Sequence, residues 1–235
     1  MHKRKDRTMR LLSLIVACTA ASASADHFDI GALVSDGRIE TWAADHTFGQ
    51  YFNPERVFAG EMDMIAGSVV GDEPGFYFQN GTVFGGAFVG FNIRAALRVW
   101  DPLAPSNAPG TNFQVMPPST LTFGDSVLGT VTTPTFDPPS PITGLQVLIP
   151  SMGVDFHFPM TLNNPAEGIF LVELELRTSL AGVQNSAPFW LVLNYGMDEP
   201  EHERAVDFVK EHIVPAPGTA AMLGLAALCL RRRRS

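Results

Sequence analysis

Apolar and polar residues alternate with a period of two along much of the middle of the chain, which predicts β-strands. In the segment 154–158 (Val-Asp-Phe-His-Phe), three apolar side chains share one face, and Asp155 and His157 share the other. The segment 169–177 repeats the pattern, with apolar residues expected to point inward and charged residues outward. Both segments therefore predict strands with one face in a core.

Turn sequences separate several further strand-like runs. Ser35-Asp36-Gly37 lies between runs at 28–34 and 38–42, which predicts a hairpin near the start of the β region. Other strands are expected at 87–100, 119–123, 127–132, 144–149 and 189–195. Because Gly-rich and Pro-rich loops connect short strands, we predict an all-β fold, an antiparallel β-sandwich or jelly-roll-like domain over residues 26–199.

The periodicity becomes helical at residues 200–213. Pro200 suits the first turn of a helix, acidic residues follow it, and basic residues lie near the other end. The apolar residues of this segment recur at helical spacing, at Ala205, Phe208, Val209 and Ile213. The segment predicts a short amphipathic helix, either docked on the β domain or forming a stalk after it.

Residues 1–25 have the order of a signal peptide, with a basic start, an apolar stretch and a small-x-small sequence. Cleavage after Ala23-Ser24-Ala25 would make Asp26 the first residue of the mature protein. The segment Ile15-Val16-Ala17-Cys18 offers an alternative, because it is similar to a lipoprotein sequence in which Cys18 carries the lipid. Both readings predict export.

The C-terminal segment 214–235 combines a Pro-rich breaker, a short apolar helix and a basic end. The breaker is Val214-Pro215-Ala216-Pro217, and the basic end is Arg231, Arg232, Arg233 and Arg234. The apolar helix expected at 219–230 is short for a membrane span, which needs roughly 20 residues. The order resembles the PEP-CTERM sorting signal, recognised by a membrane transpeptidase (exosortase), with Ala216 in place of Glu. An ordinary tail anchor or a chance apolar terminus is the alternative.

Composition narrows the class of protein further. Both cysteines, Cys18 and Cys229, lie in the terminal segments, so the remainder of the chain must be held together by its core rather than by disulfides. The whole chain has 16 Lys and Arg against 24 Asp and Glu. Loss of both terminal segments would leave a net charge of about −16, which excludes a nucleic-acid-binding surface and suits a protein that attracts cations.

The middle of the chain resembles a PEP-CTERM family under zinc-responsive (Zur) repression. The similar motifs are His27-Phe-Asp-Ile30, Gly71-Asp-Glu-Pro-Gly-Phe76, Leu97-Arg-Val-Trp-Asp-Pro102, the Phe-Leu-Val-Glu-Leu-Glu-Leu run at 170–176 and Ser186-Ala-Pro-Phe189. That family carries a His-rich strand, of which this chain retains Val154-Asp-Phe-His157. The resemblance implies an exported protein with a zinc-related role.

Metal binding is the most specific chemical function that the sequence suggests. Zinc takes three or four ligands from His, Cys, Asp and Glu, and the candidates here are His27, Asp29 and His157, with His46 as a further histidine. The family resemblance implies that His27 and His157 approach each other and bind one zinc ion, with Asp29 or Asp155 completing the site. No close ligand pair such as H-x-H occurs, so ordinary surface histidines are the alternative.

Other carboxylates have simpler interpretations. Asp72-Glu73 precedes Pro74-Gly75 and is read as a solvated acidic turn, since the D-x-D-x-D-G calcium pattern is absent. Glu173 and Glu175 lie two apart on one strand, whereas glycosidase carboxylates face each other across a cleft. We expect these two glutamates, with Arg177, to form a solvated or ion-paired face. No G-x-S-x-G sequence occurs and both cysteines lie in the terminal segments, so nucleophilic catalysis is not expected.

These observations predict an exported, non-enzymatic protein of the cell envelope, cell surface or extracellular matrix, transiently anchored by its C-terminal helix and binding a divalent metal such as zinc. Its expected partners are an exosortase-type transpeptidase and the extracellular polysaccharide or cell envelope. The alternative is a carbohydrate-binding or carbohydrate-active jelly roll. An exposed aromatic platform beside carboxylates would favour that alternative, and converging histidines would favour the metal hypothesis.

Overall fold

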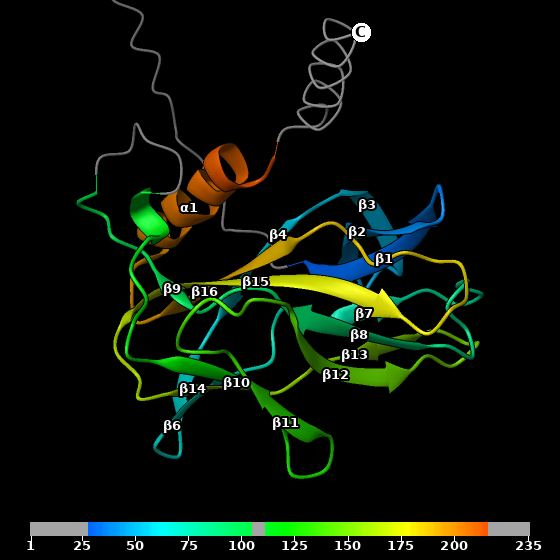
Figure 1. The fold of residues 1–235 in the computed structure, drawn as a ribbon, viewed down its shortest axis with the longest axis horizontal. Coiled ribbons are helices and arrows are strands. Elements are labelled where there is room, and N and C mark those ends of the chain that lie inside the picture. Colours follow the sequence, from blue (N-terminus) through cyan, green and yellow to red (C-terminus); the bar gives the residue numbers. More distant parts are fainter. Residues whose placement is uncertain (1–27, 105–110, 216–235) are drawn as a thin grey trace, which may run out of the picture.

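The computed structural model describes residues 28–104 and 111–215, and most of its regular structure is β-strand, as the alternation predicts. The strands form three sheets, with one α-helix near the C-terminal end of the described chain (Figure 1). The expected hairpin is formed by the first two strands of the described chain, which pair from Asp29 opposite Ala44 to Ser35 opposite Arg38.

Each sheet combines strands from distant parts of the sequence. The first has the order β13 (Val154–Phe156), β7 (Phe76–Phe78), β1 (Asp29–Ser35), β2 (Arg38–Asp45) and β3 (Gln50–Pro54). The second has the order β11 (Gly129–Thr132), β10 (Thr120–Asp125), β14 (Met160–Asn163), β6 (Ser68–Gly71) and β5 (Asp63–Ile65). The third has the order β12 (Ile142–Leu148), β8 (Phe88–Ile93), β15 (Gly168–Thr178), β16 (Phe189–Tyr195) and β4 (Val57–Glu61), and β9 (Arg98–Val99) pairs with β15.

Two strand pairs are parallel, so the expectation of an antiparallel arrangement throughout needs correction. Strands β1 and β7 run parallel, with Ile30 opposite Phe76, and β16 runs parallel to β4, with Trp190 opposite Val57. Parallel neighbours cannot be joined by a tight hairpin and need a long connection. The first and third sheets are therefore mixed, and the parallel pairs bring the N-terminal part of the chain beside much later segments.

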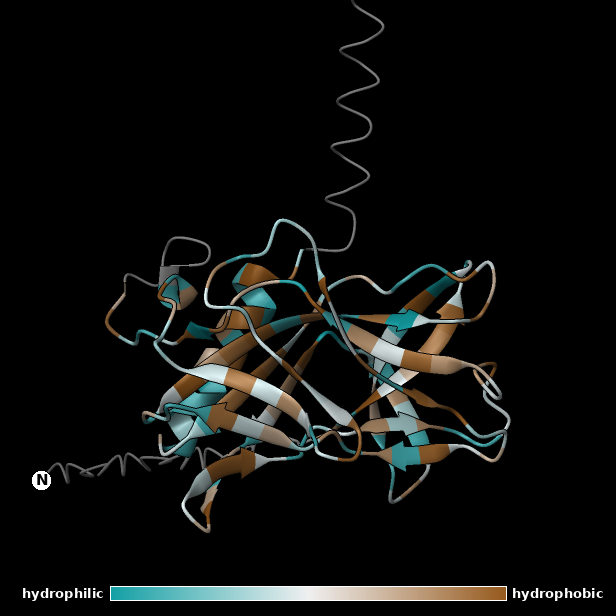
Figure 2. Cartoon of the chain, turned by 60° about the horizontal axis from the view of Figure 1, so that its bottom comes forward, coloured by the Kyte–Doolittle hydropathy of each residue, from teal (hydrophilic) through white to brown (hydrophobic). Residues whose placement is uncertain are grey.

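The central strand β15 is buried on both faces, which the alternation at 169–177 did not predict. Phe170 and Val172 pack into the main core between the sheets, while Ile169 and Leu171 pack into a second apolar cluster on the opposite face. Figure 2 shows apolar colouring along the strands through the body of the molecule. Each fully buried side chain of this kind stabilises the fold by roughly 1.5–3 kcal/mol.

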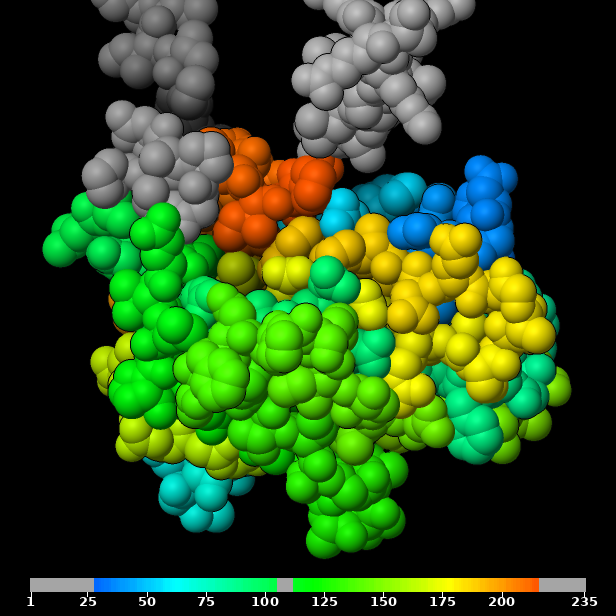
Figure 3. Space-filling model, viewed as in Figure 1, coloured from blue at the N-terminus to red at the C-terminus, as the bar shows by residue number. Residues whose placement is uncertain are grey.

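The helix predicted at 200–213 is present as α1 (Glu199–Phe208), continued by one π turn, η2 (Val209–Ile213). Asp198 caps it, because its side chain accepts a hydrogen bond from the backbone N–H of Glu201 at 3.0 Å. The buried side of the helix covers the second apolar cluster, with Ala205, Phe208 and Val209 in contact with the third sheet (Figures 1 and 3). The helix is thus docked on the domain and is not a free stalk.

Several expectations fall on residues outside the described ranges. The signal peptide, His27, the apolar segment 219–230 and the sorting residues from Ala216 onward all lie there. Within residues 28–104 and 111–215, the structure contains no helix of the length and apolar character needed to cross a bilayer.

Candidate metal centre

Three adjacent strands of the first sheet, β1, β7 and β13, bring Asp29 and His157 to the same end of the strands. Since Ile30 lies opposite Phe76 in the parallel pair and Phe76 lies opposite Phe156 in the antiparallel pair, one step along each strand aligns Asp29, Gly75 and His157 in a row. Neighbouring strands are about 4.8 Å apart, so the row places the two outer side chains on either side of Gly75. Residues 128 positions apart in the sequence thereby face a common point.

Gly75 makes this approach possible because it has no side chain. A Cβ atom at Gly75 would lie 2.6–2.8 Å from three atoms of the His157 ring, well inside van der Waals contact. The backbone N–H of Gly75 also donates a hydrogen bond of 2.9 Å to Asp29 Oδ1, and its carbonyl accepts one of 2.8 Å from the Ile30 N–H. The glycine therefore lets the imidazole lie over the backbone and fixes the orientation of the Asp29 carboxylate.

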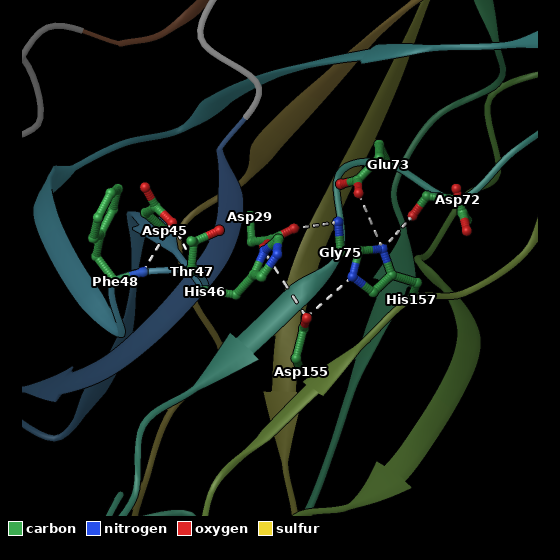
Figure 4. Close-up of polar contacts among 10 residues, drawn as sticks. All are labelled: Asp29, Asp45, His46, Thr47, Phe48, Asp72, Glu73, Gly75, Asp155 and His157. Carbon is green, nitrogen blue, oxygen red and sulfur yellow. Dashed lines mark hydrogen bonds and ion pairs between the residues drawn. The ribbon is translucent and has the colours of Figure 1, made fainter.

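His46 reaches the same point from the open end of the β1–β2 hairpin. It directly follows β2, and its Nδ1 atom lies 2.6 Å from Asp29 Oδ2. The next turn is held by Asp45, whose carboxylate accepts hydrogen bonds from the Thr47 and Phe48 N–H groups. This turn directs the His46 ring toward Asp29 (Figure 4).

Two more carboxylates complete the group. Asp155, the middle residue of β13, places Oδ1 at 3.1 Å from His157 Nε2 and Oδ2 at 3.9 Å from His46 Nδ1. Glu73 lies in the loop before β7, with Oε1 at 3.5 Å from His157 Nδ1. We call these five residues, Asp29, His46, Glu73, Asp155 and His157, the Asp29 cluster (Figure 4).

The three carboxylates favour positive charge on both imidazoles. The hydrogen bond with Asp29 raises the pKa of His46 above its usual value, and the charges of Asp29, Asp155 and Glu73 add to the effect. Burial lowers the pKa of His157, but the charges of Glu73, Asp155 and Asp29 outweigh burial, so this pKa is also raised. Burial raises the pKa of Glu73, and the neighbouring charge of Asp29 raises it further.

The ligand atoms of the Asp29 cluster are close enough to hold a metal ion. Two overlapping sets satisfy this geometry, each with its ligand atoms within 4.8 Å of one another. They are Asp29 with His46 and Asp155, and Asp29 with Glu73 and His157. Imidazole nitrogen and carboxylate oxygen are both ligands that zinc accepts, and their protons are displaced when a metal binds.

A third set of potential ligands, the His202 group, consists of Glu61, Glu199 and His202 where α1 meets the third sheet. His202 is fully buried, with Nε2 at 3.0 Å from the Val192 carbonyl oxygen and Nδ1 at 2.9 Å from Glu61 Oε1. Burial lowers the pKa of His202, but the hydrogen bonds to Glu61 and Val192 outweigh it, so this pKa is raised. When protonated, the imidazole forms an ion pair with Glu61 and donates a hydrogen bond to the Val192 carbonyl oxygen, which joins α1 to β4 and β16.

An acidic cleft of about 600 Å³ lies beside both groups, with Glu61 from one and Glu73 from the other in its lining. Its acidic lining residues are Glu61, Asp63, Asp72 and Glu73. The negative charges of these carboxylates raise the local concentration of cations in the cleft.

The structure brings together two of the three metal ligands predicted from sequence. Asp29 and His157 belong to the same ligand set, whereas His27 lies outside the described residues. His46, noted only as a further histidine, contacts Asp29 directly. Glu73 is the member that sequence reasoning missed, because the Asp72-Glu73 pair was read as a solvated turn.

The glutamates of β15 are ion-paired as expected, but with a different arginine. Arg94 Nε lies 3.0 Å from Glu173 Oε1, and Arg94 NH1 lies 2.6 Å from Glu175 Oε2. Arg177 instead donates hydrogen bonds to the Gln146 side chain and the Gly144 carbonyl oxygen. The paired glutamates are therefore held by a neighbouring strand.

Comparison with known proteins gives no further assignment. No family model matches the chain, and neither the curated proteins nor the solved structures give a match.

Proposed function

We propose that this protein is an exported, non-enzymatic protein of the cell surface or extracellular matrix that binds a divalent metal ion, zinc above all, at the Asp29 cluster. The observation that carries the proposal is the convergence of two imidazoles and three carboxylates from four separate backbone segments. Zinc sites with exchangeable metal commonly use three protein ligands and leave a position for solvent. The Asp29 cluster supplies this ligand chemistry without cysteine.

The electrostatics of the site favour a cation over protons. Each imidazole faces more than one carboxylate, with His157 near Glu73 and Asp155, and His46 near Asp29 and Asp155. A divalent ion interacts with all of these groups at once, whereas a proton serves one donor and one acceptor. The adjoining acidic cleft gives a cation a route of approach from solvent.

Zinc titration of the full chain, purified in detergent and stripped of metal, tests this function. We expect saturable zinc binding by calorimetry, with release of protons, and a loss of affinity of at least tenfold in His157→Ala. His212→Ala is the matched control, because this half-exposed histidine lies in η2, away from the cluster. Equal zinc affinity in wild type and His157→Ala would refute metal binding at this site.

The sorting part of the proposal rests on the tail sequence. Val214-Pro215-Ala216-Pro217, the apolar segment and the four arginines follow the order of a PEP-CTERM signal, so an exosortase-type transpeptidase is the proposed partner. The last regular element of the described chain, η2, ends at Ile213, directly before this tail sequence. Mass spectrometry of the protein from its native host should show a C-terminus before Arg231, and retention of Arg231 to Arg234 would overturn the sorting assignment.

We also propose that the three sheets form a β-sandwich of jelly-roll type, as expected from the sequence. Carbohydrate binding is the alternative function for such a domain. The cleft that best fits this alternative has a volume of about 380 Å³ and is lined by Asp137, Glu173, Phe113 and Trp190. Its two aromatic residues are each only 4% exposed. Because the protein itself covers these rings, they offer a sugar no open stacking surface, and we favour the metal-binding function.

A further inference from the structure

We propose that the Asp29 cluster holds two divalent metal ions, bridged by the carboxylates of Asp29 and Asp155. This inference rests on the proposed function and deepens it, because it fixes the number of ions and the role of each ligand. One ion is bound by His46 Nδ1 and the other by His157 Nε2, the two nitrogens that the Asp155 carboxylate faces.

The number of ligands is the first reason. Zinc in proteins takes three or four protein ligands, and the Asp29 cluster offers five side chains. These five divide into two sets of three that share only Asp29. Each set contains one histidine, which suits one ion in each set.

The position of Asp155 is the second reason. Its two carboxylate oxygens face different imidazoles, with Oδ1 at 3.1 Å from His157 Nε2 and Oδ2 at 3.9 Å from His46 Nδ1. Figure 4 shows the Asp155 carboxylate between the two rings. A carboxylate that presents one oxygen to each of two nitrogens has the arrangement of a bridging ligand.

The two oxygens of Asp29 also face different groups, a backbone N–H and one imidazole. It is 3% exposed, and its Oδ1 atom is fixed by the Gly75 N–H at 2.9 Å while Oδ2 faces His46 at 2.6 Å. Glu73 and His157 lie on the other side, within the second ligand set. The most buried carboxylate of the cluster is therefore the one that both sets share.

The separation of the rings is the third reason. The centroids of His46 and His157 are 6.4 Å apart, with an angle of 81° between the ring planes. Two imidazoles on one tetrahedral zinc, with Zn–N bonds of about 2.1 Å, would have centroids roughly 5 Å apart. Two ions about 3.5–4 Å apart, each bound to one ring, accommodate the wider spacing.

The stoichiometry of zinc in the full chain tests this inference. Metal analysis after desalting should give two zinc ions per chain, and Asp155→Asn should reduce the number to one or none. Cobalt in place of zinc should give a magnetically coupled pair, seen as a loss of electron paramagnetic resonance intensity per ion. Circular dichroism of Asp155→Asn verifies that this variant is folded.

Two control variants identify where the second ion lies. Glu61→Gln alters the His202 group, and His212→Ala removes a histidine of η2, so both should retain two coupled ions. Loss of one ion in either control, or two uncoupled cobalt ions, would overturn the inference. One ion per chain in wild type would overturn the inference and leave the proposed function standing, whereas no bound zinc would overturn both.

Discussion

The Asp29 cluster and the His202 group contain the same kinds of residue but are built for different tasks. His46 is 47% exposed in its side chain, and each imidazole of the Asp29 cluster has more than one carboxylate within 4 Å. His202 is fully buried, with its ring nitrogens at hydrogen-bond distance from the Val192 carbonyl oxygen and Glu61. An excess of carboxylates open to solvent suits an exchangeable cation, whereas a buried donor matched to two acceptors suits a proton.

The comparison also separates function from stability. Apart from Asp155 in the short edge strand β13, the residues of the Asp29 cluster lie at strand ends and in loops, and all of them except Asp29 are at least partly exposed. His202 lies inside α1 and contacts two strands of the third sheet. We therefore expect changes at the Asp29 cluster to affect metal binding and changes at His202 to affect folding.

The largest expected effect is that of His202→Ala on stability. The substitution removes a buried side chain and leaves the Val192 carbonyl oxygen and Glu61 without their donor, which should lower the free energy of unfolding by about 3 kcal/mol. Urea denaturation of the metal-free protein measures it. His212→Ala, a half-exposed histidine three residues after Val209, should stay within about 0.5 kcal/mol of wild type.

Urea denaturation of His46→Ala tests whether the Asp29 cluster, unlike the His202 group, contributes little to stability. Since His46 is half exposed and Asp29 keeps its hydrogen bond from Gly75, we expect a loss of about 1 kcal/mol or less without metal. A loss as large as that of His202→Ala would show that both groups serve the fold.

Zinc should stabilise the protein through the Asp29 cluster alone. At a free zinc concentration about 100 times the dissociation constant, the free energy of unfolding should rise by about 2.7 kcal/mol. His157→Ala should remove most of this gain, and Glu61→Gln should keep it. A gain lost in Glu61→Gln but kept in His157→Ala would assign the metal to the His202 group instead.

Gly75→Ala sharpens the comparison inside the cluster. The added Cβ would lie 2.6–2.8 Å from atoms of the His157 ring, so the ring must move away. We expect zinc affinity to fall about tenfold, or about 1.4 kcal/mol, while the stability of the metal-free protein changes by about 1 kcal/mol or less. Calorimetry and urea denaturation measure the two effects, and unchanged zinc affinity would show that the ring position over Gly75 is unimportant for binding.

Much of the fold could be predicted because its longer strands carry a clear pattern. The hairpin of β1 and β2, the strands β15 and β16 and the helix α1 are all present near their predicted positions. Strands β3, β5, β6, β7 and β14 are only 3–5 residues long, which is too short for periodicity to identify. The burial of both faces of β15 was missed because docking of α1 is a tertiary effect.

Only the part of the site that can be recognised from residue types was predicted from the sequence. Histidine and aspartate types identified Asp29 and His157, but the role of Glu73 depends on the parallel pairing of β7 with β1. The sequence of the three-residue strand β7 does not indicate which strand it pairs with, or whether the pair is parallel or antiparallel. The row of Asp29, Gly75 and His157 exists only once that pairing is known.

The smallest expected effect is the pH dependence that the His202 group confers on stability. Although burial lowers the pKa of His202, the bonds to Glu61 and Val192 raise it overall, so the folded protein holds this proton more tightly than the unfolded chain does. The stabilisation is then complete below the unfolded pKa of about 6.5, and it is lost as the pH rises through the folded value. One proton limits the slope to about 1.4 kcal/mol per pH unit. Urea denaturation of metal-free wild type and His202→Gln between pH 5.5 and 8.5 measures it. The fall with rising pH should be shallower in His202→Gln, and an identical pH profile in both proteins would show that the pair with Glu61 does not hold a proton.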